Sequence, residues 1–347
     1  MGPIVAFSFS LDRRFHGLAL FHFGRSHAAF PQAALPVPAD ISWQVLRTTA
    51  IDHLRLKRPA DQGMRDIGAG TLSVASINGS VTESHLYWHG PTRSTDSNVN
   101  ANVSFNGTAI NGTNIGFSAD NFWGSLNSQA YRANVSPYLT GNGNYSLSNF
   151  QKTDAQINGA ALFAFYDSGI STGKRDVAIF NGNDSNFAYQ GDPAGWNFAL
   201  SSINYTGGTA ALTLYVSDGQ NFGPADDGTL SINGITLATG GIFQGSSPRA
   251  SGAGVSNGSL TDVETFDITS FLHPGNNSLN IVLSPGFDDA ISIVAAAIDL
   301  PAGAAPPPAT IPEPTPYALM GFGLGAIWCF AFSRSRTKQR GVSNCKS

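Results

Sequence analysis

Short segments rich in strand-forming residues follow one another from Gly68 to Ala302. Leu212, Leu214 and Val216 alternate with other side chains, which is the two-residue period of a half-buried strand. The segment 291–300 is almost continuously apolar, as expected of a buried strand. Further strands are expected at 74–77, 84–88 and 103–105. Because no long amphipathic helix occurs before residue 317, we predict an all-β fold.

Asn-Gly pairs separate several of these segments. They occur at residues 78–79, 106–107, 111–112 and 233–234. Asn-Gly suits a type I′ hairpin turn because both central residues of that turn need a positive φ. We therefore predict a turn at each pair and a complete hairpin at 230–237.

Four sequence features recur in the same order at an offset of about 125 to 135 residues. The matching pairs are 86–88 with 212–216, 103–107 with 230–234, 131–142 with 266–276, and 161–166 with 291–299. The recurrence predicts two tandem β-sandwiches, at 68–190 and 191–302. The alternative is that Asn-Gly hairpins recur by chance in a β-rich chain.

The second predicted sandwich contains an informative phrase. Phe266 and Ile268 are expected to face the core, Leu272 to fill a bend, and the segment 279–283 to form an alternating strand. The phrase 266–283 resembles the strand–turn–strand element of jelly-roll, galactose-binding-like modules, which implies that the sandwiches are jelly-roll-like. Residues 84–300 also resemble a domain-of-unknown-function family of exported β-domains with no established activity. The phrases that carry this second resemblance are 86–90, 179–184, 195–198, 216–220 and 262–267.

The C-terminal stretch has three parts in a fixed order. Pro312-Glu313-Pro314 is stiff and extended, because proline fixes its own φ and disfavours helix in the residue before it. An uncharged apolar run follows at 317–332, and then a cluster of basic residues at 334–340 that includes no acid. A helix of this length spans about 24 Å, which is short for a bilayer core of about 30 Å unless flanking residues extend its reach. The positive-inside rule keeps the basic cluster cytoplasmic and places the preceding chain outside.

This arrangement resembles the PEP-CTERM sorting signal of exported Gram-negative proteins. The resemblance covers residues 312–340 and is carried by Pro312, Glu313, Pro314, Arg334 and Arg336 together with the apolar run. It implies an exosortase-type membrane protease as partner, a transmembrane sorting helix at 317–332, and cleavage near the tripeptide. The cleaved protein would then reach the cell surface or the extracellular matrix. An additional proline at 316 and the tail 341–347 depart from the pattern. The alternative is an ordinary C-terminal membrane anchor.

Two flanking regions complete the domain organisation. Residues 303–311 are rich in Pro and Ala and predict a semi-rigid linker. Residues 1–67 differ from the rest, because basic residues are frequent and the apolar stretch after Arg13-Arg14 is short and interrupted by His22. They represent either a poor, long signal region or an N-terminus that is mis-started relative to the functional gene. Little folded structure is expected there in either case.

Amino-acid composition and charge limit the classes of function that the chain can have. Only 12% of residues are charged and 39 are glycine, which is typical of a β-rich extracellular protein with many turns. Between residues 66 and 333 there are six basic residues and 19 acidic ones. Such a region does not attract nucleic acid, although it could attract cations. Both cysteines, Cys329 and Cys345, lie in the apolar run and the tail, so the exported part has no internal disulfide.

Four acids are candidate calcium ligands. Asp226, Asp227, Asp288 and Asp289 lie in predicted loops, and calcium takes six to eight oxygen ligands from flexible loops. The alternative is that these acids are solvated turn residues. Alternation places Asp262 and Glu264 on one face of a strand, which is also what a polar outer face looks like.

Trp123 and Trp196 are candidates for stacking on sugar rings, because glycines and asparagines surround them. The alternative is that they are core residues of a sandwich. For catalysis we predict no residues. His85 and His89 lie on a predicted strand and do not form the helical zinc pair of an H-E-x-x-H motif, and no serine lies in G-x-S-x-G.

Together these features predict an exported structural or adhesive protein of an exopolysaccharide or biofilm matrix. A carbohydrate-binding module is the alternative, with extracellular polysaccharide as its partner. A glycoside-active enzyme is a third and weaker hypothesis.

Overall fold

A computed structural model describes residues 46–47, 54–56, 59–118, 124–170, 174–186, 195–222, 227–254, 257–286 and 290–306. The chain divides into two units, Met1–Ala39 and Asp40–Ser347, and every described residue belongs to the second. The regular structure of these ranges is β apart from one 3₁₀ turn, Thr269–Phe271. The predicted all-β class is therefore confirmed, in the form of four antiparallel sheets that make β-sandwich-like units.

The first half of the described chain forms two sheets. The first outer sheet has the order β4–β10–β6–β7, at Gly70–Val74, Gly143–Ser148, Asn102–Phe105 and Thr108–Asn111. The first inner sheet has the order β2–β11–β5–β9–β8, at Leu54–Leu56, Gly159–Asp167, Ser80–Thr92, Asn127–Asn134 and Thr113–Ser118. Strand β3 (Ala60–Gly63) also pairs with β11.

The second half forms two further sheets, and β1 from the start of the described chain joins one of them. The second inner sheet has the order β1–β12–β19–β14–β17, at Leu46–Arg47, Arg175–Asn186, Ile291–Pro301, Ala211–Ser217 and Thr261–Asp267. The second outer sheet has the order β13–β18–β15–β16, at Trp196–Tyr205, Gly275–Leu283, Thr229–Ile232 and Ile235–Thr239.

Seven strands of each half occur in corresponding order. The order β11–β5–β9 matches β19–β14–β17, and β4–β10–β6–β7 matches β13–β18–β15–β16. The hairpin turns correspond as well. Asn106 and Gly107 have φ of 49° and 78°, and Asn233 and Gly234 have φ of 52° and 78°. The four recurring sequence features therefore lie on equivalent strands, which favours a genuine repeat over chance.

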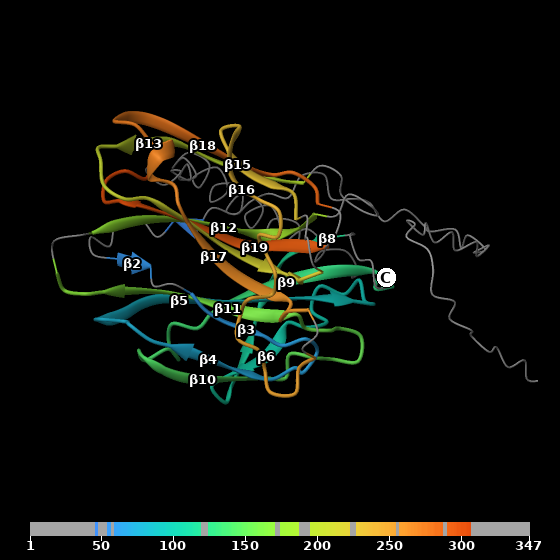
Figure 1. The fold of residues 1–347 in the computed structure, drawn as a ribbon. Helices are drawn as coiled ribbons and strands as arrows, with labels where there is room; N and C mark the ends of the chain where they lie inside the picture. Colours follow the sequence, from blue (N-terminus) through green and yellow to red (C-terminus); the bar gives the residue numbers. More distant parts are fainter. Residues whose placement is uncertain are drawn as a thin grey trace, which may run out of the picture. The chain divides into compact units, whose positions relative to one another are not determined.

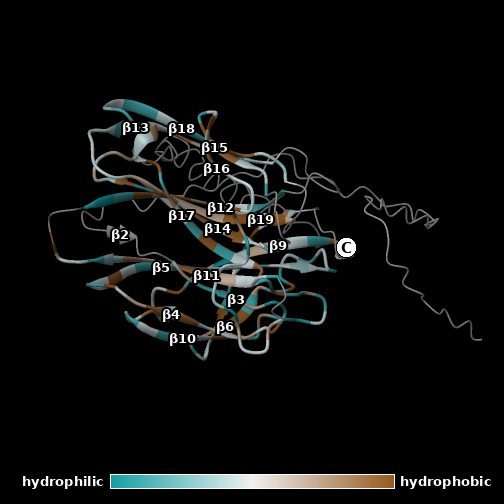
Figure 2. Cartoon of the chain, in the orientation of Figure 1, coloured by the Kyte–Doolittle hydropathy of each residue, from teal (hydrophilic) through white to brown (hydrophobic). Residues whose placement is uncertain are grey.

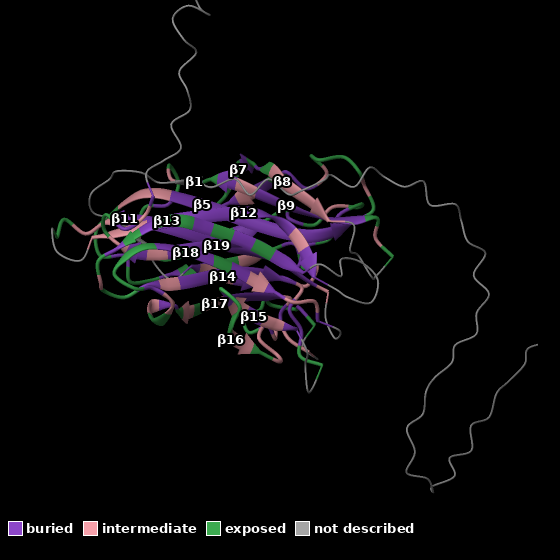
Figure 3. Cartoon of the chain, turned by 90° about the horizontal axis from the view of Figure 1, so that it is seen from above, coloured by how far each residue is buried: buried purple, intermediate pink, exposed green. Residues whose placement is uncertain are grey.

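Three apolar clusters hold the four sheets in a stack (Figure 1). One cluster packs the first outer sheet on the first inner sheet, and it includes Trp88, which stacks on Tyr131 with ring centroids 5.5 Å apart. Another packs the second inner sheet on the second outer sheet. The third lies between the two inner sheets and contains Tyr87, Phe163 and Tyr215. Strands β11 and β19 of the inner sheets are accordingly buried along most of their length (Figure 3).

Burial on both faces explains the sequence of the inner strands. Strand β19 reads as a nearly continuous apolar run because its side chains enter two cores in turn, as do those of β11. The outer strands instead alternate, so Leu279, Ile281 and Leu283 of β18 are buried while the residues between them are more accessible. The expectation that Ile268 and Leu272 enter the core is also confirmed.

Two of the Asn-Gly pairs that were predicted to form turns do not join paired strands in a hairpin. The residues around Asn78-Gly79 connect β4 to β5, which lie in different sheets. Asn111-Gly112 links β7 to β8, which also lie in different sheets, and Gly112 has no positive φ. A Cβ on Gly112 would overlap the ring of Trp88. Glycine is needed there because of close packing and not because of a turn.

Candidate functional site

Asp227 anchors a long connection between two strands of the second half. Its side chain is fully buried, and its Oδ2 accepts a hydrogen bond of 2.7 Å from the backbone N–H of Phe243. Its own N–H donates to the carbonyl of Gly240 over 3.1 Å. These contacts hold the start of the connection 240–260, which joins β16 to β17. The other three predicted calcium ligands, Asp226, Asp288 and Asp289, lie outside the described residues. Within the described ranges no group of three or more His, Cys, Asp and Glu residues is placed to hold a metal ion.

Asp262 supports the same connection from β17. Its Oδ1 accepts the N–H of Ser246 at 2.7 Å, and its Oδ2 accepts the N–H of Gly245 at 2.8 Å. Burial raises the pKa of Asp262 to about 6, although these hydrogen bonds act in the opposite direction. Glu264 points to the same side of the strand and accepts from the Ser246 hydroxyl over 3.1 Å. The pair therefore does not form a solvated outer face, because the connection 240–260 covers Asp262.

A charged cluster joins this connection to the first sandwich. Arg65 donates from Nη1 to Asn257 Oδ1 at 2.9 Å and to the carbonyl of Gly258 at 2.7 Å. Burial raises the pKa of Asp218 to about 7, the Arg65 charge partly offsets this shift, and the Asp66 charge adds to it. Asp66 in turn accepts the N–H of Ile157 at 3.2 Å. The cluster ties loops of the two halves together, which is a structural role.

Polar side chains fill one end of the space between the two inner sheets. His89 on β5 is buried, and burial lowers its pKa to about 3, with neighbouring Asn183 partly offsetting the shift. Asn183 on β12 donates from Nδ2 to the carbonyl of Ser128 at 3.0 Å and to its hydroxyl at 3.1 Å. The hydroxyl groups of Ser185 and Ser292 lie 2.6 Å apart in the same region. This polar seam fixes how the two inner sheets face each other.

The two histidines of β5 do not form a metal site. Four residues of strand separate His85 from His89, which corresponds to about 13 Å. The Nε2 atom of His85 lies 2.7 Å from Glu83 Oε1 near the start of the strand, whereas His89 lies in the polar seam.

Of the two candidates for sugar stacking, Trp196 is a core residue, which is the alternative that the sequence left open. Trp196 begins β13, is 1% exposed and packs against Phe243 with ring centroids 5.8 Å apart. Its ring is therefore part of the second core and is not available to stack on a sugar. Trp123 lies outside the described residues. Trp88 is a core residue, as its strand context indicates.

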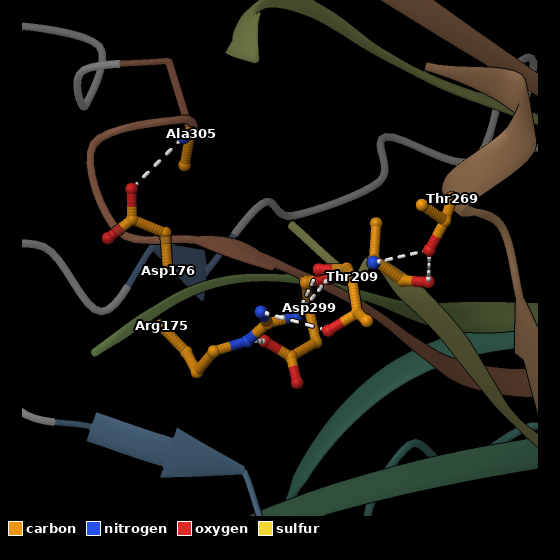
Figure 4. Close-up of polar contacts among 7 residues, drawn as sticks. Arg175, Asp176, Thr209, Thr269, Asp299 and Ala305 are labelled. Carbon is orange, nitrogen blue, oxygen red and sulfur yellow. Dashed lines mark hydrogen bonds and ion pairs between the residues drawn. The ribbon is translucent and has the colours of Figure 1, made fainter. Parts of the chain in front are cut away.

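The C-terminal end of the last strand is fixed to the second half (Figure 4). Arg175 on β12 donates from Nε to Asp299 Oδ1 of β19 at 2.7 Å, and from Nη2 to the carbonyl of Thr209 at 2.7 Å. Beyond β19, the N–H of Ala305 donates to Asp176 Oδ2 over 3.0 Å. The described chain thus stays attached to the sheets as far as the first residues of the predicted linker.

The sorting-signal residues Pro312, Glu313, Pro314, Arg334 and Arg336 and the predicted span 317–332 lie outside the described residues. Among the ranges that the structure describes, no helix has the length and apolar character needed to cross a membrane.

The two outer sheets present a surface that the sequence analysis did not single out. The outer strands alternate between hydrophobic and hydrophilic residues (Figure 2). Not one of their eight strands contains Asp, Glu, Lys or Arg. All charged residues in the described strands belong to the two inner sheets. The absence of charged residues from these strands can be seen in the sequence. Only the sheet order shows that the strands form two continuous faces.

Comparison with known proteins adds little. No protein-family model and no curated protein matches the chain. A β-porphyranase of glycoside hydrolase family 86 from the human gut bacterium Bacteroides plebeius is similar at 11% identity and a TM-score of 0.21, over 76% of this chain and 37% of that one. A second enzyme of family 86, solved with neoagarooctaose, is similar at 11% identity and a TM-score of 0.18, over 68% of this chain and 31% of that one. The chain thus spans about a third of the length of these enzymes, and at such TM-scores the likeness supports neither a family nor an activity.

Proposed function

We propose that this chain is an exported protein, sorted by an exosortase-type membrane protease, with a structural or adhesive role at the cell surface or in an exopolysaccharide matrix. The observation that carries the proposal is the order of three features in the sequence: Pro312-Glu313-Pro314, the apolar run 317–332, and the basic cluster from Arg334. In this proposal the apolar run is a transmembrane helix that holds the chain in the membrane until cleavage.

The finer architecture belongs to the same proposal. Each half pairs a four-stranded outer sheet with an inner sheet, and the two halves share one strand order. These features, with the phrase 266–283, support two jelly-roll-like sandwiches in tandem. Such a rigid body without disulfides is suited to a scaffold, since its stability comes from three apolar cores.

The contacts of the last strand, β19, are also suited to a protein that is attached through its C-terminus. Strand β19 lies between β12 and β14 and is hydrogen-bonded on both sides. The Arg175–Asp299 ion pair and the Asp176–Ala305 hydrogen bond reinforce its end. Tension on a C-terminal anchor would therefore act on a strand paired along both of its edges.

Processing in a bacterium that has an exosortase tests the proposal. We expect a tagged full-length chain to be shortened at its C-terminus and to appear at the cell surface or in the medium. Alanine substitution of Pro312, Glu313 and Pro314 should leave it uncut in the membrane. The matched control replaces Pro306, Pro307 and Pro308 of the linker and should be processed normally.

Two results would contradict the proposal. An uncut chain that stays in the membrane whether or not the protease gene is present would identify an ordinary anchor. A chain recovered from the cytosol of the same host would reject export altogether.

Calcium remains a prediction within this proposal. If Asp226, Asp227, Asp288 and Asp289 share an ion, a chelator should lower the melting temperature of the wild type and have no effect on a variant with Asp288 and Asp289 changed to Asn. If calcium and chelator change the melting temperature of both proteins equally, Asp288 and Asp289 do not bind calcium.

A further inference from the structure

The two outer faces are unusual in carrying no charge. Protein surfaces ordinarily place Lys, Arg, Glu and Asp on solvated positions, and the inner sheets of this chain contain such residues. The outward side chains of the first outer sheet are instead hydroxyl and amide groups. They include Thr71, Ser73, Asn102, Asn144, Ser146 and Ser148, all exposed.

The second outer sheet repeats this chemistry on its own outward face. Asn197, Ser201 and Asn204 of β13 are exposed beside Ser278 and Asn280 of the neighbouring strand β18. The only large apolar side chain that the described strands of these two sheets leave strongly exposed is Ile235, which is 63% exposed and lies on edge strand β16. Because the two halves share one strand order, the outer faces are equivalent surfaces.

The groups on these faces suit a neutral, hydroxyl-rich partner. Serine and threonine hydroxyl groups and asparagine amides both donate and accept hydrogen bonds, as sugar hydroxyl groups do. Ser73 already donates to Asn144 Oδ1 across two strands at 2.7 Å, so neighbouring strands present their polar groups within reach of one another. A charged side chain in such a face would have to lose its hydration when a neutral polymer covers it, which is costly.

Other partners fit less well. The faces have no positive charge to attract nucleic acid or an acidic polymer. They also lack the methionine and arginine residues that are enriched in protein–protein interfaces. From the uncharged hydroxyl and amide chemistry we infer that each outer face binds a neutral polysaccharide chain. This inference rests on the proposed role in an exopolysaccharide matrix and deepens it.

The stacking of the four sheets places the two outer faces on opposite sides of the molecule. Two inner sheets separate the two outer sheets, and packed sheets lie about 10 Å apart, so the faces are on opposite sides of a body about 30 Å thick. One copy of the chain can then hold two polysaccharide chains at once and cross-link them. Each face alone would bind weakly, and simultaneous binding to one polymer network would add avidity.

Retention on insoluble neutral polysaccharides tests the inference in vitro, independently of export. The full-length chain would be purified in a polyoxyethylene detergent, which carries no sugar, and applied to cellulose, agarose and cross-linked dextran. Ser146 on β10 and Asn280 on β18 would be changed together, once to Glu and once to Lys. We expect retention on at least one polymer, reduced about tenfold or more in both double variants. Ser251→Glu and Ser251→Lys, on an exposed residue of the connection 240–260, should bind as the wild type does.

The outcomes are distinguishable. No retention on any of the neutral polymers, or equal retention of all variants, overturns the inference while leaving the sorting proposal untouched. Alginate serves as the acidic probe. If the Glu double variant loses retention on alginate and the Lys double variant gains it, the partner is an acidic polymer and the inference of a neutral one is overturned. Self-association of the chain without polysaccharide, abolished by the same variants, would assign the faces to a second copy. A variant changed on one face only should still bind polysaccharide beads but should no longer clump them. If this variant clumps beads as well as the wild type does, the cross-linking role is rejected.

Discussion

The inner and outer sheets of this protein differ in how many of their faces are covered. The inner sheets are covered on both faces, and β11 and β19 are apolar along most of their length. The outer sheets are covered on one face, and β10 and β18 alternate between buried and more accessible residues. The difference shows that the second half packs on the first through a whole sheet face, and the Arg65 cluster adds contacts between loops of the two halves.

The location of charge follows the same division. Ionisable groups near the inner sheets are held by specific partners, as Asp262 is by Gly245 and Ser246, or have a strongly shifted pKa, as His89 has. The outer strands contain no ionisable side chain of Asp, Glu, Lys or Arg. The pH dependence of stability is therefore expected to come from groups at the inner sheets and not from the outer faces.

The largest expected effect lies between the inner sheets. Phe163 is fully buried there and packs edge-on against Tyr87 with ring centroids 5.4 Å apart. Phe163→Ala should lower the free energy of unfolding by about 3–5 kcal/mol, because the closely packed sheets cannot collapse into the cavity. Ser146→Ala on an outer face should change it by less than about 0.5 kcal/mol. Denaturant unfolding of both variants measures the contrast, and similar values would contradict the division of roles.

A pH effect of on the order of 3 kcal/mol should come from the polar seam. The pKa of His89 in the folded protein is about 3, below its ordinary value of 6.5. The neutral ring therefore contributes its full share of stability above about pH 6.5, and this share is lost as the pH falls toward 3. His89→Gln should flatten the decrease in unfolding free energy between pH 7 and 4. The exposed His273→Gln is the control, and an unchanged slope in the His89 variant would show that the ring is not buried as described.

Smaller effects than these are expected at three glycines that each follow an asparagine. Gly112→Ala places a Cβ against Trp88 and should cost about 1–3 kcal/mol through overpacking. Gly107→Ala meets no atom within 4 Å, so only its positive φ of 78° opposes the change, at about 1 kcal/mol. Gly234→Ala is the equivalent turn position of the second half, also at φ 78°, and should match Gly107→Ala. Denaturant unfolding measures the loss of stability in each variant. If the losses for the two turn variants differ from each other by more than either differs from the loss for Gly112→Ala, the repeat is contradicted.

Much of the fold was accessible from the sequence because strand periodicity is a local property. Alternation at 279–283, the apolar run at 291–300 and the Asn-Gly turns at 106–107 and 233–234 all depend on neighbouring residues, and the structure has them as expected. The site was less accessible. The sequence left open whether Asp262 lies on a solvated face and whether Trp196 stacks on a ligand or lies in the core. In the structure the connection 240–260 covers Asp262, and Trp196 packs on Phe243.

What the sequence alone determined is the β class, the repeated order of strands and the C-terminal order of proline tripeptide, apolar run and basic cluster. What only the tertiary structure decided is which sheet faces meet: that the two halves bury Tyr87 and Tyr215 between them, and that two uncharged faces remain outside. The physical reason is that the period of a strand shows which side chains point to one side. It does not show whether a second sheet, a long connection or solvent lies on that side.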